Sequence, residues 1–111
     1  MNIGELAGLC GWKLVAGKGG INRPVDSCYI GDLLSWVMGR ADENNLWLTV
    51  MGNVNAVAVA VLADVSGIVL TESAVLDDDA KARAEMENIP VFATDKNTYE
   101  TAIDVYHKLN P

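Results

Sequence analysis

The sequence predicts an α/β fold: a single three-layer domain over residues 1–111, with a mostly parallel sheet of about five strands and helices on both faces. Three short apolar runs, Leu46–Val50, Gly67–Leu70 and Ile89–Phe92, are each followed by a segment of helical length. Strands of a parallel sheet are buried on both faces and therefore appear as continuous apolar runs. Each run also ends in small polar residues, at the edge where open α/β sheets bind ligands.

The amino-terminal segment is expected to form a helix. Asn2 can cap it, Gly11 can end it, and Ile3, Leu6 and Ala7 lie at helical spacing between them.

Two strands and a second helix are expected next. The strands are Trp12–Val15 and Val25–Ile30, separated by a glycine turn at Gly17–Gly20. Asp32 is expected to cap a strongly apolar helix, and Gly39–Asn45 is expected to form a loop.

The segment Asn55–Ala63 fits two structures. Its alternation of alanine and valine has the period of a strand. However, parallel neighbouring strands need a connection of a dozen or more residues, which is usually helical. Met51–Gly67 supplies that length, and Asn53 or Asn55 supplies a cap, so a helix is favoured.

Two further helices complete the expected order, in which each of the last three strands is followed by a helix. Asp77–Asp79 places negative charge at a helix start, with Ala80, Ala84 and Met86 expected to face the sheet. Thr98 is expected to cap the last helix. The expected apolar stripe of that helix is Tyr99, Ala102, Ile103, Tyr106 and Leu109.

Composition argues against several classes of partner. Eight basic and fifteen acidic residues give a net charge of −7, which disfavours nucleic-acid and anionic-membrane binding. The chain start lacks the features of a signal peptide, and no apolar run approaches the ~20 residues of a membrane span. We therefore expect a cytoplasmic protein in which Cys10 and Cys28 are reduced and pack in the core, a disulfide between them being the minor alternative.

No segment spells out a catalytic mechanism. Gly17–Gly20 lacks the order of a phosphate-binding Walker loop, and His107 is the only histidine. Asp77–Asp79 is better explained as helix capping than as a cation site, because consecutive side chains point in different directions. No metal and no cofactor are predicted.

Polar side chains at the strand ends are the candidate ligand-binding residues. Capping of the following helix explains Asn53 or Asn55, but it leaves the threonines free for a ligand such as a nucleotide or a small carboxylate. The candidate set is Thr49, Asn53, Asn55, Thr71, Ser73 and Thr94.

Tryptophans suggest a second kind of site. Trp12 and Trp47 flank expected strands and are assigned to the core, whereas Trp36 lies in an apolar segment that could form a surface patch. The candidate homodimer contact consists of Leu33, Leu34, Trp36, Val37 and Met38.

Several short motifs together resemble a DRTGG domain over nearly the whole chain. They are Leu14–Gly17, Asn22–Val25, Tyr29–Met38, Asn55–Ala60, Ile68–Thr71 and Ile89–Val91. The resemblance implies an α/β accessory domain, similar to those found with phosphotransacetylase and with CBS-containing pyrophosphatases, and similar in fold to the amino-terminal domain of HPr kinase.

Two stretches depart from the family pattern. Gly52-Asn53-Val54 stands where members often have Gly-Asp-Arg, and Leu70-Thr71-Glu72-Ser73 stands where they often have Leu-Thr-Gly-Gly. Loss of the two glycines is expected to remove a backbone that could approach an anionic ligand, and Glu72 is expected to repel phosphate.

The resulting hypothesis is a non-catalytic regulatory or scaffolding module that forms a homodimer and controls a separately encoded metabolic or redox enzyme. The alternative is a small-ligand sensor that uses the strand-end residues. An enzyme of unrecognised class ranks third, because neither a paired nucleophile and base nor a metal set is apparent.

Overall fold

The computed structural model describes residues 1–111, and its elements follow the expected order. The strands are β1 (Lys13–Ala16), β2 (Ser27–Ile30), β3 (Asn45–Thr49), β4 (Gly67–Leu70) and β5 (Val91–Ala93). The helices are α1 (Ile3–Cys10), α2 (Leu34–Arg40), α3 (Val54–Ala63), α4 (Asp78–Glu87) and α5 (Thr98–Leu109). The ambiguous alanine–valine segment is thus helical, as its length indicated.

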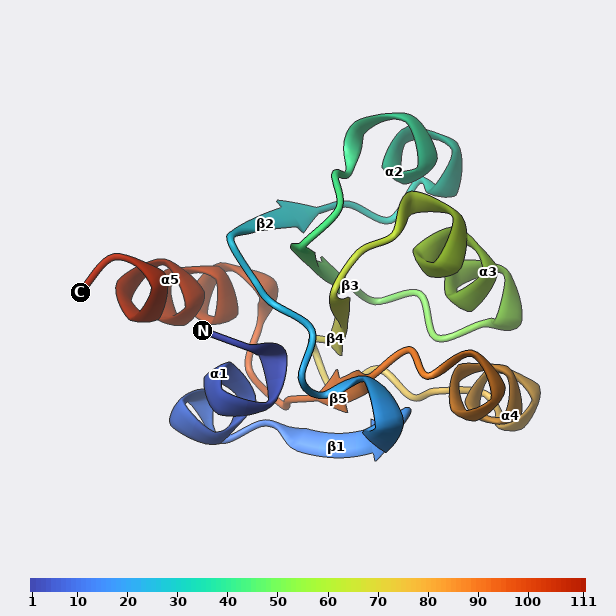
Figure 1. The fold of residues 1–111 in the computed structure, drawn as a ribbon, viewed down its shortest axis with the longest axis horizontal. Helices are drawn as coiled ribbons and strands as arrows, with labels where there is room; N and C mark the ends of the chain where they lie inside the picture. Colours follow the sequence, from blue (N-terminus) through green and yellow to red (C-terminus); the bar gives the residue numbers. More distant parts are fainter.

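The sheet has the order β1-β5-β4-β3-β2, with only β1 antiparallel to its neighbour. From β2 to β5 the chain steps across the sheet in one direction. Because such crossovers are right-handed, α2, α3 and α4 lie on one face, while α1 and α5 cover the other (Figure 1). The expected three-layer fold is confirmed.

The core has two halves, one on each face of the sheet. Alternate residues of β3 enter different halves: Leu46 and Leu48 face α1 and α5, and Trp47 faces α2, α3 and α4. The expectation that Trp12 and Trp47 lie in the core is confirmed. Trp12 packs on Phe92 with ring centroids 6.2 Å apart, and Trp47 Nε1 donates to the Gly31 carbonyl at 2.8 Å.

Helix caps agree with the prediction at some ends and differ at others. Asn2 forms a capping box with Glu5, and Gly11 ends α1 in a left-handed conformation. The caps predicted at Asp32 and Thr98 are wrong by one residue. Leu33 takes the N-cap position of α2 without a side-chain bond, and Asn97 caps α5 by accepting from the Glu100 N–H.

Two predicted helix faces are wrong in part, although Ala102 and Leu109 of the predicted α5 stripe do pack against the core. Met86 is 76% exposed, whereas Ala80 and Ala84 are buried as expected. In α5 the buried residues are Thr101 and Val105, and Tyr99, Ile103 and Tyr106 point to solvent. Thr101 tolerates burial because its hydroxyl donates to the Asn97 carbonyl at 2.8 Å, while the tyrosines keep their phenol groups in water.

The glycine segment Gly17–Gly20 forms a turn that packs against a neighbouring loop. Gly17 has φ 76°, and a Cβ there would collide with the Ile89 carbonyl. The 3₁₀ turn Lys18–Gly20 therefore lies against the loop between α4 and β5, which accounts for its glycines. None of the helices combines the length and apolar character needed to cross a bilayer.

Candidate functional site

The end of β3 is tied to the loop that follows β2. Thr49 is buried, and its hydroxyl donates to Asp32 Oδ1 at 2.7 Å and accepts from the Met51 N–H at 3.1 Å. Asp32 Oδ1 also accepts from the Val50 N–H at 3.0 Å. Asp32 therefore joins two loops instead of capping α2, and the Thr49 hydroxyl is already satisfied.

The two asparagines after β3 have different roles. Asn53 caps α3 by accepting from the Ala56 N–H at 2.9 Å. Asn55 is exposed in the first turn of that helix and makes no side-chain hydrogen bond within the chain. Neither lines a cavity with the other candidate residues.

The end of β4 is tied to the start of α5. Thr71 is fully buried, and its Oγ1 lies 2.7 Å from Thr98 Oγ1. Glu72 Oε2 accepts from the Thr98 N–H at 2.9 Å, so a carboxylate of the chain itself occupies the amino-terminal end of α5. An alanine at Thr71 would disturb this packing as well as any ligand.

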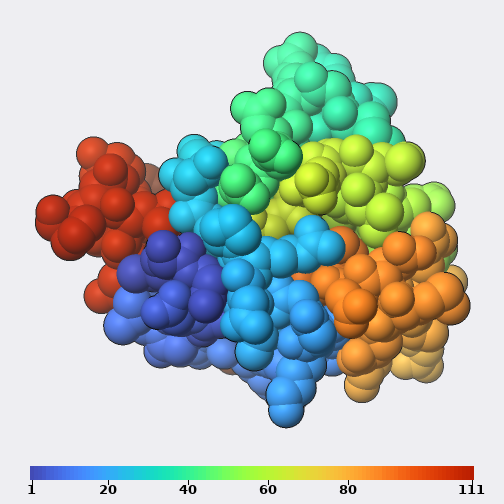
Figure 2. Space-filling model, viewed as in Figure 1, coloured from blue at the N-terminus to red at the C-terminus, as the bar shows by residue number.

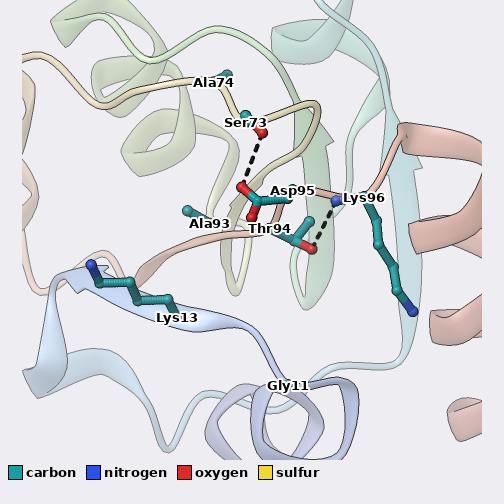
Figure 3. A pocket seen from close by; sticks show the side chains of 8 residues that line it. All are labelled: Gly11, Lys13, Ser73, Ala74, Ala93, Thr94, Asp95 and Lys96. Carbon is teal, nitrogen blue, oxygen red and sulfur yellow. Dashed lines mark hydrogen bonds between the residues drawn. The ribbon is translucent and has the colours of Figure 1, made fainter.

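Ser73 and Thr94 are the two candidate residues that the fold brings together. They lie in a cleft of about 380 Å³ at the carboxyl ends of β4 and β5 (Figure 3). After β4 the chain crosses to one face of the sheet and after β5 to the other, which is the position where α/β sheets form crevices. The lining residues are Gly11, Lys13, Ser73, Ala74, Ala93, Thr94, Asp95 and Lys96.

Lys13, Asp95 and Lys96 were not predicted as cleft residues. Lys13 arrives because β1 runs antiparallel to β5 and places Lys13 opposite Ala93, a pairing that a sequence pattern does not reveal. Lys96 Nζ donates to Asp104 Oδ2 at 2.9 Å, and this bond raises the pKa of Lys96. In Figure 3 both lysine side chains extend away from the centre of the cleft.

The polar groups of the cleft are largely satisfied by one another. Ser73 Oγ donates to Asp95 Oδ1 at 2.9 Å, and Thr94 Oγ1 accepts from the Lys96 N–H at 3.3 Å (Figure 3). The exposed His107 lies outside the cleft, and the centroid of its ring is 5.9 Å from that of Tyr106. No three histidine, cysteine or acidic side chains gather as a metal site would require.

The predicted contact residues around α2 divide between surface and core. Leu33 and Trp36 are 57% and 53% exposed, and Met38 is also exposed. Val37 is fully buried in the core, and Leu34 is partly buried against it, so these two do not form a surface. The guanidinium carbon of Arg40 lies 3.8 Å from the centre of the Trp36 ring. We call Leu33, Trp36 and Arg40 the α2 surface.

A comparison with known families decides the relationship of the chain. The model of the DRTGG domain matches residues 5–107. The chain belongs to the DRTGG domain family. No curated protein matches it.

A solved structure supports the same fold for this DRTGG domain. It contains the CBS and DRTGG domains of the regulatory region of Clostridium perfringens pyrophosphatase, complexed with the activator diadenosine tetraphosphate. The similarity has a TM-score of 0.69 at 9% identity, and it covers 94% of this chain and 45% of that one. The chain thus spans less than half of the regulatory region that it resembles.

The departure from Leu-Thr-Gly-Gly in this DRTGG domain leaves a left-handed backbone at the two substituted positions. Glu72 and Ser73, which stand in place of the glycines, both have φ of 60°. The left-handed conformation therefore remains without the glycines, whereas the expected loss of close approach to an anionic ligand stays a prediction. What changes is the side chain, since Glu72 reaches the start of α5.

Proposed function

We propose that this DRTGG domain is a non-catalytic regulatory module that forms a homodimer and controls a separately encoded metabolic or redox enzyme through protein contact. The observation that carries the proposal is the α2 surface, on which a large aromatic ring is exposed beneath an arginine. Tryptophan and arginine are enriched among the residues that dominate protein interfaces. The stacked pair loses little side-chain freedom on binding, because Arg40 already restricts the ring.

The strand-end chemistry supports a non-catalytic role. Catalysis by a nucleophile or a general base needs a side chain that is free to meet substrate. Here Thr49, Thr71 and Ser73 each use the hydroxyl in a bond within the chain. The occurrence of a similar domain in the regulatory region of a pyrophosphatase favours the same conclusion.

The dimer contact is tested by Trp36→Ala. We expect at least about a tenfold weaker dimer, since truncation of a central tryptophan costs more than ~1.4 kcal/mol at such interfaces. Sedimentation equilibrium of the purified chain gives the dimer Kd.

Tyr99→Ala serves as the matched control, because Tyr99 is an exposed aromatic residue on another helix. The proposed homodimer is contradicted if both substitutions have an equal effect. It is also contradicted if the wild-type chain stays monomeric at about 100 μM.

A second candidate function is sensing of a small ligand, which the position of the cleft favours. Ser73, Thr94 and Lys13 lie at the crevice between β4 and β5, where a nucleotide or a small carboxylate could bind. The pyrophosphatase region was solved with diadenosine tetraphosphate, so that compound, adenine nucleotides and pyruvate are the first probes.

Calorimetric titration with these probes tests the sensor. A saturable signal that Lys13→Ala weakens, and that Lys81→Ala on the exposed side of α4 leaves unchanged, supports this function. A flat titration with every probe rejects the cleft as a site for these ligands.

A further inference from the structure

The two edges of the sheet are protected very differently. At the β1 edge, Lys13 is exposed and the register with β5 shifts between Leu14 and Ala16, which marks a bulge. Charges and bulges are the devices by which proteins keep an edge strand from pairing with other chains. The β2 edge has neither: its residues are Ser27-Cys28-Tyr29-Ile30, and its register with β3 is regular.

The backbone of β2 presents hydrogen-bonding groups at its open side. The Gly31 N–H, just after the strand, donates to the Leu48 carbonyl of β3 at 3.3 Å. The backbone N–H and C=O groups of successive strand residues point to opposite sides. Those of Tyr29 therefore also point toward β3, whereas those of Cys28 and Ile30 point outward. This alternation begins at Ser27, since the Asp26 N–H also turns toward β3 and donates to the Asn44 carbonyl.

An apolar groove runs beside this open edge. It has a volume of about 370 Å³ and lies between β2 and α5. Its apolar lining consists of Cys28, Ile30, Ala102, Val105, Tyr106 and Leu109. Ile30, the last residue of β2, is 52% exposed, although branched aliphatic residues are most often buried.

One end of the groove carries an acidic group. Asp26, directly before β2, is exposed, lines the groove and takes part in no ion pair within the chain. The chain as a whole has a net charge of −7. A basic residue of a binding partner would find complementary charge at this end of the groove.

We propose that the β2 edge binds an extended segment of a partner protein, which adds to the sheet as a sixth strand. Apolar side chains at alternate positions of that segment enter the groove beside α5, and a basic residue of the segment meets Asp26. This mode of recognition combines backbone hydrogen bonds with pockets for alternate side chains. The inference rests on the proposed function, in which the module acts by contacting another protein.

The shape of the molecule favours a single extended chain over a second copy of the domain. In Figure 2 the helices α2 and α5 project on either side of the β2 region, and the surface is recessed between them. An extended segment fits such a recess, whereas a second β2 edge must bring its own projecting helices with it.

The test is selection of a phage-displayed library of random ten-residue peptides against the full chain. We expect enriched peptides with apolar residues at alternate positions and a lysine or arginine near one end. Ile30→Lys should weaken binding of the best synthetic peptide at least tenfold, because it places a charge at the groove. Leu14→Lys, which alters an exposed residue at the β1 edge, should leave binding unchanged.

Amide hydrogen exchange provides a second readout that does not depend on a variant. The bound peptide should slow exchange of the Cys28 and Ile30 amides, which face the open edge. No enriched peptide, equal binding by Ile30→Lys and wild type, or unchanged exchange at these amides would overturn the proposal. It would also be overturned if Ile30→Lys, but not Trp36→Ala, dissociated a homodimer, because the edge would then pair with a second copy.

The proposal and the proposed function can fail separately. A homodimer that Trp36→Ala weakens, together with no peptide binding, removes the strand-addition site and leaves the regulatory homodimer. Peptide binding by a strictly monomeric chain would instead remove the homodimer and leave the strand-addition site.

Discussion

Single polar side chains at the strand ends hold neighbouring loops together. Asp32 joins the loops after β2 and β3, Glu72 joins the loop after β4 to α5, and Ser73 bonds to Asp95 after β5. A bond between charged and neutral partners typically contributes about 1.5–3 kcal/mol when buried and less when exposed. Two of the candidate ligand-binding residues, Thr49 and Ser73, take part in these bonds, which connect loops of the fold.

Cys28 gives a pH-dependent prediction. Burial raises the pKa of its thiol from 9.0 to about 12. Well below pH 9 the thiol is protonated in both states, so the folded chain keeps its full stability. Between pH 9 and 12 only the unfolded state loses the proton, and the free energy of unfolding should fall by up to about 1.4 kcal/mol per pH unit from this group.

Urea unfolding of wild type and Cys28→Ala between pH 8 and about pH 10.5 measures this contribution. Other groups titrate in the same range, so the relevant quantity is the difference between the two proteins. The stability of Cys28→Ala should fall less steeply with pH, and parallel curves would refute a buried, protonated thiol.

At the residue scale, the sequence predicted well where helices begin and end. It predicted less well which residue makes each capping bond. Asn2 and Gly11 have no rival of suitable chemistry beside them, and both predictions are confirmed. Asn97 and Thr98 are adjacent and are both good caps, and only the tertiary bond between Thr98 and Thr71 decides between them. Asp32 was assigned to the wrong partner for the same reason, since Thr49 is distant in sequence.

The helix α3 shows how an element with weak intrinsic helix preference is stabilised. Its sequence is almost entirely alanine and valine, and Ala56, Val57, Val59 and Ala60 are buried. Valine is a poorer helix former than alanine, so burial and the Asn53 cap must supply the stability. The helix ends at Asp64, which has φ of 56° and lies where the macrodipole disfavours a negative charge.

We predict that Asp64→Gly stabilises the chain. Glycine adopts the left-handed conformation without a steric cost, and the substitution removes the unfavourable charge, for a gain of about 0.5–1 kcal/mol. The surface ion pair of Asp64 with Arg23, at 3.6 Å, is a small loss.

Asp64→Ala removes the same charge but keeps a Cβ in the left-handed region, and it is the matched control. Thermal unfolding should give a higher Tm for the glycine variant than for wild type and the alanine variant. A glycine variant that melts no higher than the alanine variant contradicts the predicted benefit of the backbone conformation.

At the element scale, the order of helices and strands followed from the sequence, but the rotation of α5 did not. Apolar residues occur around much of this helix, so a stripe through Tyr99, Ile103 and Tyr106 appeared as good as the true one through Val105. The choice depends on the close packing of α5 against α1 and the sheet, where Thr101 and Ala102 fit and tyrosines do not.

The whole molecule carries an excess of negative charge that any homodimer must bring together. Each chain has a net charge of −7, and the α2 surface contains one cation, Arg40. Repulsion between the two chains should therefore oppose dimerisation at low ionic strength. Added salt shortens the screening length from roughly 30 Å at 0.01 M to about 8 Å at 0.15 M.

We predict that the dimer Kd decreases severalfold when NaCl is raised from about 10 mM to about 150 mM. Sedimentation equilibrium at both salt concentrations measures the change. A dimer that weakens with salt would instead indicate an interface held by ion pairs, and it would contradict the mainly apolar contact proposed for the α2 surface.

Strand order is the property of the whole molecule that the sequence did not supply. The apolar runs revealed the strands and the connection lengths indicated parallel pairing, as the structure confirms. Nothing local shows that β1 pairs with β5, because that contact joins Lys13 to Ala93. The cleft residue Lys13 was missed for this reason, whereas Ser73 and Thr94 lie shortly after the ends of β4 and β5 and could be found.

The pairing of β1 with β5 also determines when the fold can be completed during synthesis. Within residues 1–111, α1 and β1 are made before the other elements, yet β1 has no strand to join until β5 has left the exit tunnel. The parallel part, β2 to β4, can assemble earlier because its contacts are closer in sequence. Of these elements, the earliest to be translated are thus among the last to be fixed, and closure of the sheet awaits translation of β5.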